Sequence, residues 1–442
     1  MLTNVWLKAD SPTSMHFLIT AIGSYGDVHP MVGLGEALRT RGHQATVFAS
    51  PYFADVIAGA GLDLVPIGTV TDYMEMTKHP DLWHPRRSLP FVFRESVGRF
   101  AREAYGKMLE HYEPGNTVIV AHGLDAAGRL LGDTHGVPVS SVIFAPIGLW
   151  SNYHAPKAVG AFTGPHVPRW FNRLQFWLAD RIIFHPHLAK PINECRRELN
   201  LPPIKRVFDE WWYKTDQILC LFPDWFGPPQ PDWPEGVELV GFPLWDGGQT
   251  GSLSPDVSEF LDAGEPPIVF TPGSANRDAA RFLAVAVEAC QRLGRRGILL
   301  TKFAEQLPKS LPTSVRHFAF VPLTQLLPRA AAFVHHAGIG SCSQGLAAGI
   351  PQLLRPMAFD QPDNADRLVR LGVARVLPPK RFHASAVAEA INQLTHDPVV
   401  AERCKVLAGR CRNAHALDRA CDALERLGTA ISPAASTAIN TS

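Results

Sequence analysis

The chain has 442 residues and a formal net charge of +1, so it is longer than one hydrophobic core usually allows and we expect two domains. Acidic and basic residues balance and form no basic run, which argues against a nucleic-acid partner and against a polybasic membrane patch. The seven cysteines are odd in number and include no C-x-x-C pair, which argues against a disulfide framework or a zinc site and favours the cytoplasm.

Residues 1–14 carry Lys8 and Asp10 and contain no apolar stretch. We expect them to form a flexible N-terminus that is neither a signal peptide nor a membrane anchor. The first regular elements follow, with an apolar strand at residues 16–22 and a helix at residues 30–41.

A glycine-containing turn, residues 23–26, joins this strand to its helix, and a second strand is expected at residues 45–49. Such a βαβ unit places its turn at the carboxyl end of the sheet, where open α/β sheets bind ligands. A dinucleotide site would require G-x-G-x-x-G in the turn and an acidic residue after the second strand. The chain has G-x-x-G and Ser50 instead, which excludes that class.

Two aromatic-rich regions, residues 69–113 and 150–213, interrupt the strands of the first domain. They can line a cleft for an apolar molecule, or their aromatic side chains can simply pack helices onto the sheet. The candidate cleft residues are Trp83, Phe91, His122, Trp150, Phe162 and Trp170.

Residues 223–262 are crowded with Pro and Gly and are predicted to link an N-terminal domain, residues 15–222, to a C-terminal domain, residues 263–400. Strands and helices alternate in the second domain as they do in the first. A long helix is expected at residues 401–428, followed by a disordered tail at residues 429–442.

One junction in the second domain is built to bind an anion. A buried strand at residues 332–335 runs through a glycine turn into a helix, whose first N–H groups and positive dipole end suit phosphate. Gly338 and Gly340 let an anion approach the backbone, while Ser341 adds a hydroxyl donor and His336 a ring N–H.

A second strand, residues 352–357, delivers Asp360 and Gln361 to the same edge of the sheet. These two side chains form a polar, sugar-sized hydrogen-bonding pair beside the anion site. The local interpretation is therefore a phosphate site with a sugar next to it.

The motifs HHAGIGS, residues 335–341, and LAAGIPQLLRPMAFDQPDNA, residues 346–365, resemble the nucleotide-sugar-binding segment of the GT-B fold UDP-glycosyltransferase family, the family 1 glycosyltransferases. Within that family the resemblance is strongest to rhamnolipid-type rhamnosyltransferases and to bacterial sterol or natural-product glucosyltransferases. It implies two Rossmann-like α/β domains facing across a cleft, with a C-terminal helix that crosses back to the first domain. The donor would be held mainly by the second domain and the acceptor by the first.

The resemblance also implies roles for residues outside the two motifs. Ser274 would join His336 and Ser341 at the donor diphosphate. Phe320 stands where plant relatives stack a Trp on uracil, and Val321 would help read the base edge through its backbone; alternatively, Phe320 simply ends a buried strand.

Gln344 departs from the family pattern, because many UDP-sugar relatives carry a Glu there that holds both ribose hydroxyls. An amide binds hydroxyls more weakly than a carboxylate does. This substitution favours a dTDP-sugar, whose deoxyribose lacks one of those hydroxyls.

Asp27 is the expected catalytic base, since inverting glycosyl transfer needs a group that takes the proton of the acceptor hydroxyl. Many relatives carry His at this position and a bacterial subset carries Asp; His29 is the second choice. An alternative role for Asp27 is the N-cap of the following helix, and both roles can hold. His122 and Asp125 fall where His-bearing relatives keep a helper Asp, so that dyad would be absent or reversed here.

The expected reaction is inverting transfer of a hexose, favoured as rhamnose from dTDP-rhamnose, to a hydroxyl of an apolar acceptor such as a hydroxy-fatty-acid ester. We expect no cofactor and no metal, because the helix terminus, His336 and Ser341 would offset the charge of the leaving diphosphate and no D-x-D motif stands at a plausible metal site.

Three alternatives remain open. One is a UDP-glucose-dependent glucosyltransferase that acts on a sterol or polyketide-like acceptor. The others are a nucleotide-sugar epimerase and a non-catalytic nucleotide-sugar-binding partner of a transferase. The oligomeric state is also open, as is transient contact with the inner face of a membrane, because an apolar cleft can collect its acceptor from a bilayer surface.

Overall fold

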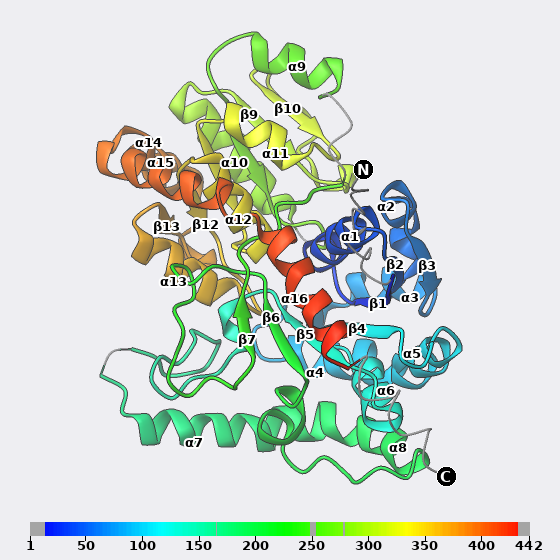
Figure 1. Cartoon of the computed structure of the whole chain (residues 1–442). Helices are drawn as coiled ribbons and strands as arrows, with labels where there is room; N and C mark the ends of the chain where they lie inside the picture. Colours follow the sequence, from blue (N-terminus) through cyan, green and yellow to red (C-terminus); the bar gives the residue numbers. More distant parts are fainter. Residues whose placement is uncertain (1–13, 165, 248–252, 277–278, 432–442) are drawn as a thin grey trace, which may run out of the picture.

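The computed structural model describes residues 14–164, 166–247, 253–276 and 279–431. The predicted flexible N-terminus and disordered tail therefore lie outside the described residues, apart from Ser14 and residues 429–431. Two lobes, each a parallel sheet covered by helices, face one another (Figure 1). This arrangement confirms the predicted pair of Rossmann-like domains.

The first lobe contains a seven-stranded sheet in the order β3-β2-β1-β4-β5-β6-β7. The central strands are buried on both faces and read as continuous apolar runs, as parallel sheets require. The strand order reverses between β1 and β4, which opens a crevice at their carboxyl ends. The strands are β1 (His16–Ala21), β2 (Gln44–Ala49), β3 (Asp63–Pro66), β4 (Thr117–His122), β5 (Val139–Ile143), β6 (Gln217–Cys220) and β7 (Val237–Leu239).

Residues 70–110 of the first aromatic-rich region and residues 169–198 of the second are mostly helical. The segment Phe93–Gly98 joins α4 to α5, and Asp180–Ala189 joins α7 to α8, each as a wider, π-helical stretch. The helices are α1 (Tyr25–Thr40), α2 (Ala54–Gly59), α3 (Val70–Lys78), α4 (Ser88–Val92), α5 (Arg99–Glu110), α6 (Ala127–His135), α7 (Arg169–Ala179) and α8 (Lys190–Glu198).

The second lobe contains a six-stranded sheet in the order β10-β9-β8-β11-β12-β13, and its order reverses between β8 and β11. The strands are β8 (Ile268–Thr271), β9 (Gly297–Leu300), β10 (Val315–Phe318), β11 (Ala332–His335), β12 (Gln352–Leu354) and β13 (Ala374–Val376). The helices are α9 (Pro255–Asp262), α10 (Ala280–Leu293), α11 (Leu323–Leu326), α12 (Ile339–Ala348), α13 (Gln361–Leu371) and α14 (Ala384–His396).

The segment predicted as a linker, residues 223–262, is partly built into both lobes. Strand β7 pairs with β6 and completes the first sheet. Helix α9 buries Val257, Phe260 and Leu261 in the second lobe. The Pro and Gly residues therefore indicated irregular backbone, but the segment is not a free linker between the lobes.

The single helix predicted at residues 401–428 is instead two helices, α15 (Pro398–Arg412) and α16 (Ala416–Ile431), separated at His415, whose φ of +45° no α-helix allows. Helix α15 packs on α12 of the second lobe. Helix α16 packs on α1 of the first lobe, which confirms that the C-terminal helix crosses back.

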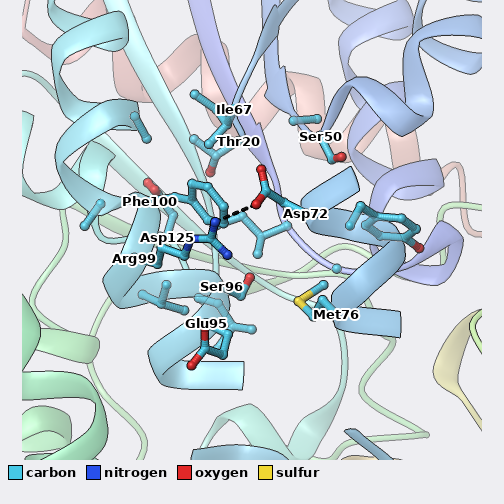
Figure 2. A pocket seen from close by; sticks show the side chains of 18 of the residues that line it. Thr20, Ser50, Ile67, Asp72, Met76, Glu95, Ser96, Arg99, Phe100 and Asp125 are labelled. Carbon is cyan, nitrogen blue, oxygen red and sulfur yellow. Dashed lines mark hydrogen bonds and ion pairs between the residues drawn. The ribbon is translucent and has the colours of Figure 1, made fainter. Parts of the chain in front are cut away.

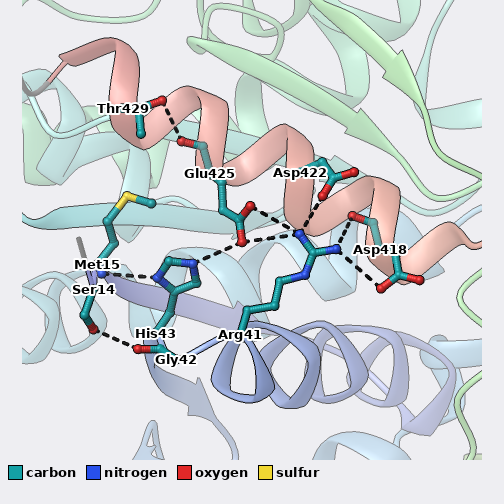
Figure 3. Close-up of polar contacts among 9 residues, drawn as sticks. All are labelled: Ser14, Met15, Arg41, Gly42, His43, Asp418, Asp422, Glu425 and Thr429. Carbon is teal, nitrogen blue, oxygen red and sulfur yellow. Dashed lines mark hydrogen bonds and ion pairs between the residues drawn. The ribbon is translucent and has the colours of Figure 1, made fainter. Parts of the chain in front are cut away.

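Polar contacts fix α16 to the first lobe (Figure 3). The guanidinium of Arg41 donates to Asp422 and Glu425 and to the backbone of Asp418. The ring of His43 contacts Glu425 at 3.1 Å. Behind these polar groups the apolar side of α16 is fully buried in the first-lobe core, through Ala420, Cys421, Ala423 and Leu424.

Across the described residues, the helices are all too short or too polar to cross a bilayer.

Candidate active site

A cavity of about 940 Å³ lies between the lobes, at the carboxyl ends of both sheets. The turns after β1 and β4 line it from the first lobe, and the turns after β8, β11 and β12 line it from the second. All of the residues predicted to bind the donor or act as base line this one cavity: Asp27, His29, Ser274, Phe320, Val321, His336, Gly338, Gly340, Ser341, Gln344, Asp360 and Gln361.

The anion site is the N-terminus of α12. Gly338 is its N-cap, and Gly340 and Ser341 belong to the first turn, whose N–H groups have no partners within the helix. The helix also meets the other lobe here, since a Cβ on Gly340 would lie 3.8 Å from Cα of Gly26 in the first turn of α1. The positive ends of two helix dipoles, one from each lobe, therefore converge on one side of the cavity.

The ring of His336 lies between two glycines. A Cβ on Gly338 would lie 2.5 Å from Nε2 of His336, and a Cβ on Gly273 would lie 3.0 Å from the ring. Gly338, predicted to let an anion approach the backbone, thus also makes room for the imidazole. Burial lowers the pKa of His336 to about 4, so the ring is neutral near pH 7 and keeps one N–H to donate.

Lys302 adds a cation that the sequence analysis missed. It follows β9, lines the cavity and donates from Nζ to the hydroxyl of Tyr25 in the other lobe at 2.7 Å. Burial lowers the pKa of Lys302 from its usual value. A usable signal was present, since Lys302 follows a buried strand at the ligand edge of the sheet.

Asp360 and Gln361 lie beside the anion site, and both also hold the protein's own backbone. Asp360 accepts hydrogen bonds from Asn364 (2.6 Å) and from the N–H of Ile339 (3.3 Å). Burial, with a smaller contribution from the negative charge of Asp27, raises the pKa of Asp360 to about 7. The carbonyl oxygen of Gln361 accepts from the N–H groups of Met357 and Ala358, so its amide nitrogen is the group that can donate to a sugar.

Asp27 occupies the third position of α1 and not the predicted N-cap, because the helix begins at Tyr25, five residues earlier than expected. Ser24 is the N-cap, and Asp27 accepts from its N–H at 2.8 Å in a reciprocal capping box. Gly23, at φ +125°, leaves space for the carboxylate, since a Cβ there would lie 2.3 Å from Oδ2. The side chain of Asp27 remains 38% exposed toward the cavity.

His122 lies behind this carboxylate. Its Nδ1 accepts the N–H of Leu124 at 3.0 Å, so its proton is on Nε2, and Nε2 lies 3.7 Å from Oδ1 of Asp27. Asp125 is not part of the pair, because its buried carboxylate accepts from the N–H groups of Ala127 and Gly128 at the start of α6. Asp27 therefore lines the cavity and His122 stands behind it, at a distance longer than a hydrogen bond.

His29, the second-choice base, has a different environment. Its ring packs edge-on against Tyr25 and Trp245, with centroids 5.1 and 5.3 Å away. Burial, together with the charge of Lys302, lowers the pKa of His29 to about 4. His29 is therefore a weak proton acceptor near pH 7.

The residues predicted to bind the nucleobase also line the cavity. Phe320 is 53% exposed there, as a stacking platform would be, while Val321 and Gln344 are buried. The ring of Phe320 is therefore available for stacking. The alternative, that Phe320 ends a buried strand, is wrong because the side chain is exposed.

The predicted acceptor residues divide into three groups. Trp83, His122 and Trp150 line the main cavity. Phe91 is buried beside a second, smaller cavity of about 460 Å³ in the first lobe, seen in Figure 2. Phe162 and Trp170 line neither cavity and are 70% and 67% exposed, so the prediction was wrong for both.

The reason lies in the orientation of α7. This helix turns Gln175, Phe176 and Ala179 toward the cavity and Trp170 away from it. Apolar residues occur all round α7, so their periodicity could not identify the inner face. Sequence analysis therefore missed Phe176 and chose Trp170.

Comparisons with known proteins agree with this geometry. Residues 297–415 match the family model described as the C-terminal domain of erythromycin biosynthesis protein CIII-like proteins. The chain is 29% identical to O-mycaminosyltylonolide 6-deoxyallosyltransferase of Streptomyces fradiae, over 93% of this chain and 97% of the relative. It is 30% identical to glycosyltransferase GtfC of Amycolatopsis orientalis, over 85% of this chain and 90% of the relative.

Among solved structures, glycosyltransferase VinC in complex with dTDP superposes with a TM-score of 0.66 at 20% identity, covering 94% of this chain and all of VinC. The two-lobed architecture, the anion site at the helix termini and these relatives all support the same family assignment. The chain belongs to the family 1 glycosyltransferases of GT-B fold, and it is a nucleotide-sugar-dependent hexosyltransferase.

Proposed function

We propose that the enzyme transfers a 6-deoxyhexose from a dTDP-sugar to a hydroxyl of an apolar natural product, with inversion at the anomeric carbon. The observation that carries the proposal is that the Asp27–His122 pair and the α12 terminus line the same cavity. A base and a site for a leaving anion within one cavity are what an in-line displacement needs.

In the proposed reaction, Asp27 takes the proton of the acceptor hydroxyl as its oxygen attacks the anomeric carbon. The bond from that carbon to the diphosphate oxygen breaks, and its electron pair leaves with the diphosphate. The helix termini, the N–H of His336 and the ammonium of Lys302 stabilise the charge that develops there. Nε2–H of His122, 3.7 Å from Oδ1 of Asp27, places the positive end of its dipole behind the carboxylate.

The choice of donor rests on Gln344 and on the relatives. Gln344 is buried at the cavity and offers the ribose an amide in place of a carboxylate. VinC binds dTDP, and the Streptomyces relative is named for transferring a 6-deoxyallosyl group. These observations favour a dTDP-6-deoxyhexose, and rhamnose is the member of that class favoured by the sequence.

The proposal for the acceptor rests on the side chains that line the cavity. Trp83 and Trp150 line it, and Trp150 stacks on Phe176 and Phe208 with ring centroids 4.6 and 3.9 Å away. These stacked rings make the wall apolar, and the Streptomyces relative is named for the acceptor O-mycaminosyltylonolide. We therefore place a macrocyclic or polycyclic product ahead of the hydroxy-fatty-acid ester.

We further propose that catalysis does not depend on a divalent ion. The two helix termini, His336 and Lys302 together supply the positive electrostatics that a metal would otherwise provide. Transfer that is unchanged by a chelator would support this part, and transfer abolished by the chelator and restored by Mg²⁺ would contradict it.

A mass-spectrometric screen tests the whole proposal. The protein is incubated with dTDP- and UDP-linked sugars and a panel of macrolide aglycones, sterols and hydroxy-fatty-acid esters. We expect a new conjugate from a dTDP-6-deoxyhexose and an aglycone. An isomerised donor in the absence of acceptor would indicate an epimerase instead, and donor binding without turnover on any acceptor would indicate a non-catalytic partner.

A further inference from the structure

The outer face of α7 and of the segment that follows it is an exposed apolar stripe. Fourteen large hydrophobic side chains are exposed in the described residues, and eight of them lie in this one region of the first lobe. The remaining six lie elsewhere and only two of them, Val399 and Val406 of α15, share an element, so the concentration is local. The eight are Tyr153, Val159, Phe162, Trp170, Leu174, Trp177, Leu178 and Ile182.

The stripe has a regular helical spacing. Exposed pairs recur every four residues, at 169–170, 173–174, 177–178 and 181–182, while Asn172, Asp180 and Phe184 are buried on the inner side. Three of the four pairs combine an Arg with an apolar residue. At 1.5 Å per residue the stripe from Trp170 to Ile182 is roughly 18 Å long, and Figure 1 shows α7 along the lower rim of the first lobe.

Within the segment that carries the stripe, all but one of the charged residues are basic. Residues 153–190 contain five Lys or Arg residues and one acidic residue, Asp180, which is buried and accepts the N–H of Val207. Lys157 pairs with Asp366, but none of Arg169, Arg173 and Arg181 has an ion pair among the described residues. The guanidinium groups of Arg169 and Arg181 lie over the rings of Tyr153 and Trp177.

We propose that this face, Trp170 to Ile182 with Phe162 and its three arginines, docks on an anionic lipid bilayer. An interfacial helix combines Trp, Leu and Ile on the side that enters the acyl boundary with Arg at headgroup level. Long cationic side chains can keep their charged ends among phosphates while their stems cover apolar surface. Each cation near an anionic membrane surface adds electrostatic attraction, and the three arginines of this face form no ion pair within the part of the chain that the structure describes.

A second copy of the chain fits this face less well. A two-fold interface brings the same patch of both copies together, so it would oppose Arg169, Arg173 and Arg181 to their own equivalents. An anionic lipid surface complements those charges instead.

Docking in this way would place the active-site cavity at the membrane. The inner side of α7 lines that cavity through Gln175, Phe176 and Ala179. The segment 156–161 lines it as well, and Val159 in that segment is 42% exposed. Only this last step, in which an apolar acceptor enters from the bilayer, rests on the proposed function; the docking surface itself does not.

Vesicle co-sedimentation of the full chain tests the proposal. We expect the protein to sediment with vesicles of equimolar phosphatidylcholine and phosphatidylglycerol, to sediment much less with phosphatidylcholine alone, and to be released by rising salt. Trp170→Ser with Ile182→Ser should lower the partition coefficient at least about tenfold. Arg173→Glu with Arg181→Glu should lower it by a similar factor at low salt and by less at high salt.

A matched control comes from α15, where Val399 and Val406 are 55% and 48% exposed on the second lobe. Val399→Ser with Val406→Ser should leave partitioning unchanged. All the substituted side chains are exposed, so each variant should keep the wild-type circular dichroism spectrum.

Three results would overturn the proposal. They are no binding of the wild type to anionic vesicles, equal binding by the Trp170→Ser, Ile182→Ser variant, and a wild-type dimer in solution that this variant converts to a monomer. Donor hydrolysis measured without vesicles reports separately on the transferase activity, so failure to dock and failure of the proposed chemistry are distinguishable.

Discussion

The donor side and the acceptor side of the cavity are assembled in different ways. Most donor-side residues lie within 26 positions, from His336 to Gln361, on two consecutive strand–turn–helix junctions. The acceptor side combines Asp27, His122 and Trp150 from three distant segments. A site made of local junctions can be recognised from sequence, whereas a site made by tertiary packing depends on which way each helix turns.

The largest expected effect is on turnover, and it tests Asp27, the proposed base on the acceptor side. Asp27→Asn keeps an oxygen that can accept the N–H of Ser24, so the start of α1 is preserved. Without a base, transfer should slow by roughly 10²–10⁴-fold. Turnover is followed by mass spectrometry and nucleoside diphosphate binding by calorimetry, and binding should not change. Undiminished turnover would remove Asp27 from catalysis and favour a non-catalytic protein.

The next effect tests the donor side. His336→Ala should weaken nucleoside diphosphate binding by on the order of 1 to 3 kcal/mol, the typical cost of losing a hydrogen bond to a charged group. Calorimetry that shows no change would remove His336 from the site.

Two glycines of the same turn separate the contribution of the ring from that of the backbone. In Gly338→Ala the new Cβ would lie 2.5 Å from Nε2 of His336 and must displace the ring. In Gly340→Ala the nearest atom is 3.8 Å away, so the protein itself has room. We expect the first variant to weaken diphosphate binding toward the His336→Ala value, by about 1 kcal/mol or more, and the second to have a smaller effect. Equal losses would instead indicate that close approach of the anion to the backbone dominates.

A smaller effect is expected behind the base. His122→Leu removes the N–H that lies 3.7 Å from Oδ1 of Asp27 and should lower kcat by up to about tenfold with little change in KM, because the carboxylate loses the polar group behind it. His122→Gln can still donate from its amide and should recover part of the rate. Wild-type kcat in both variants would show that His122 does not act on Asp27. A loss of thermal stability in both, with no selective effect on kcat, would show that its role is packing.

The smallest effect is a pH dependence of stability on the donor side. The pKa of Asp360 is raised from 3.8 to about 7, so the folded state holds this proton more tightly than the unfolded state. The stabilisation it gives is complete below the lower value and is lost as pH rises through the higher one. Asp360→Asn has no proton to lose, so its free energy of unfolding relative to wild type should increase over that interval and level off above it. Urea melts across the interval would show this, and a constant difference would contradict it.

How much the sequence could reveal follows the same division. The alternation of strands and helices, the ligand edge and the α12 junction were all predictable, because each depends on neighbours within about ten residues. The start of α1 was missed because Pro30 was interpreted as a first-turn proline, although Ser24 and Asp27 have the spacing of a capping box.

The break between α15 and α16 had a weaker signal, with Asn413 at the C-cap and Arg410 and Arg412 in the last turn. Neither Pro nor Gly stands at residues 413–415, and His415 adopts its left-handed conformation because the chain must leave one lobe for the other. The two errors on the acceptor side, Phe162 and Trp170, have the same origin, since only the packed structure determines which apolar face of a segment is inward.

The return of α16 to the first lobe has a consequence for biosynthesis. Met15 and Val118 lie in the first-lobe core beside α16, and Gly428 packs against both of them so closely that it has no room for a Cβ. During translation the first lobe leaves the ribosome before the second, yet this part of its surface stays uncovered until residues 416–431 have been made. The lobe that is synthesised first is therefore the one that is completed last, and a nascent chain paused before Ala416 would expose an apolar groove that chaperones recognise.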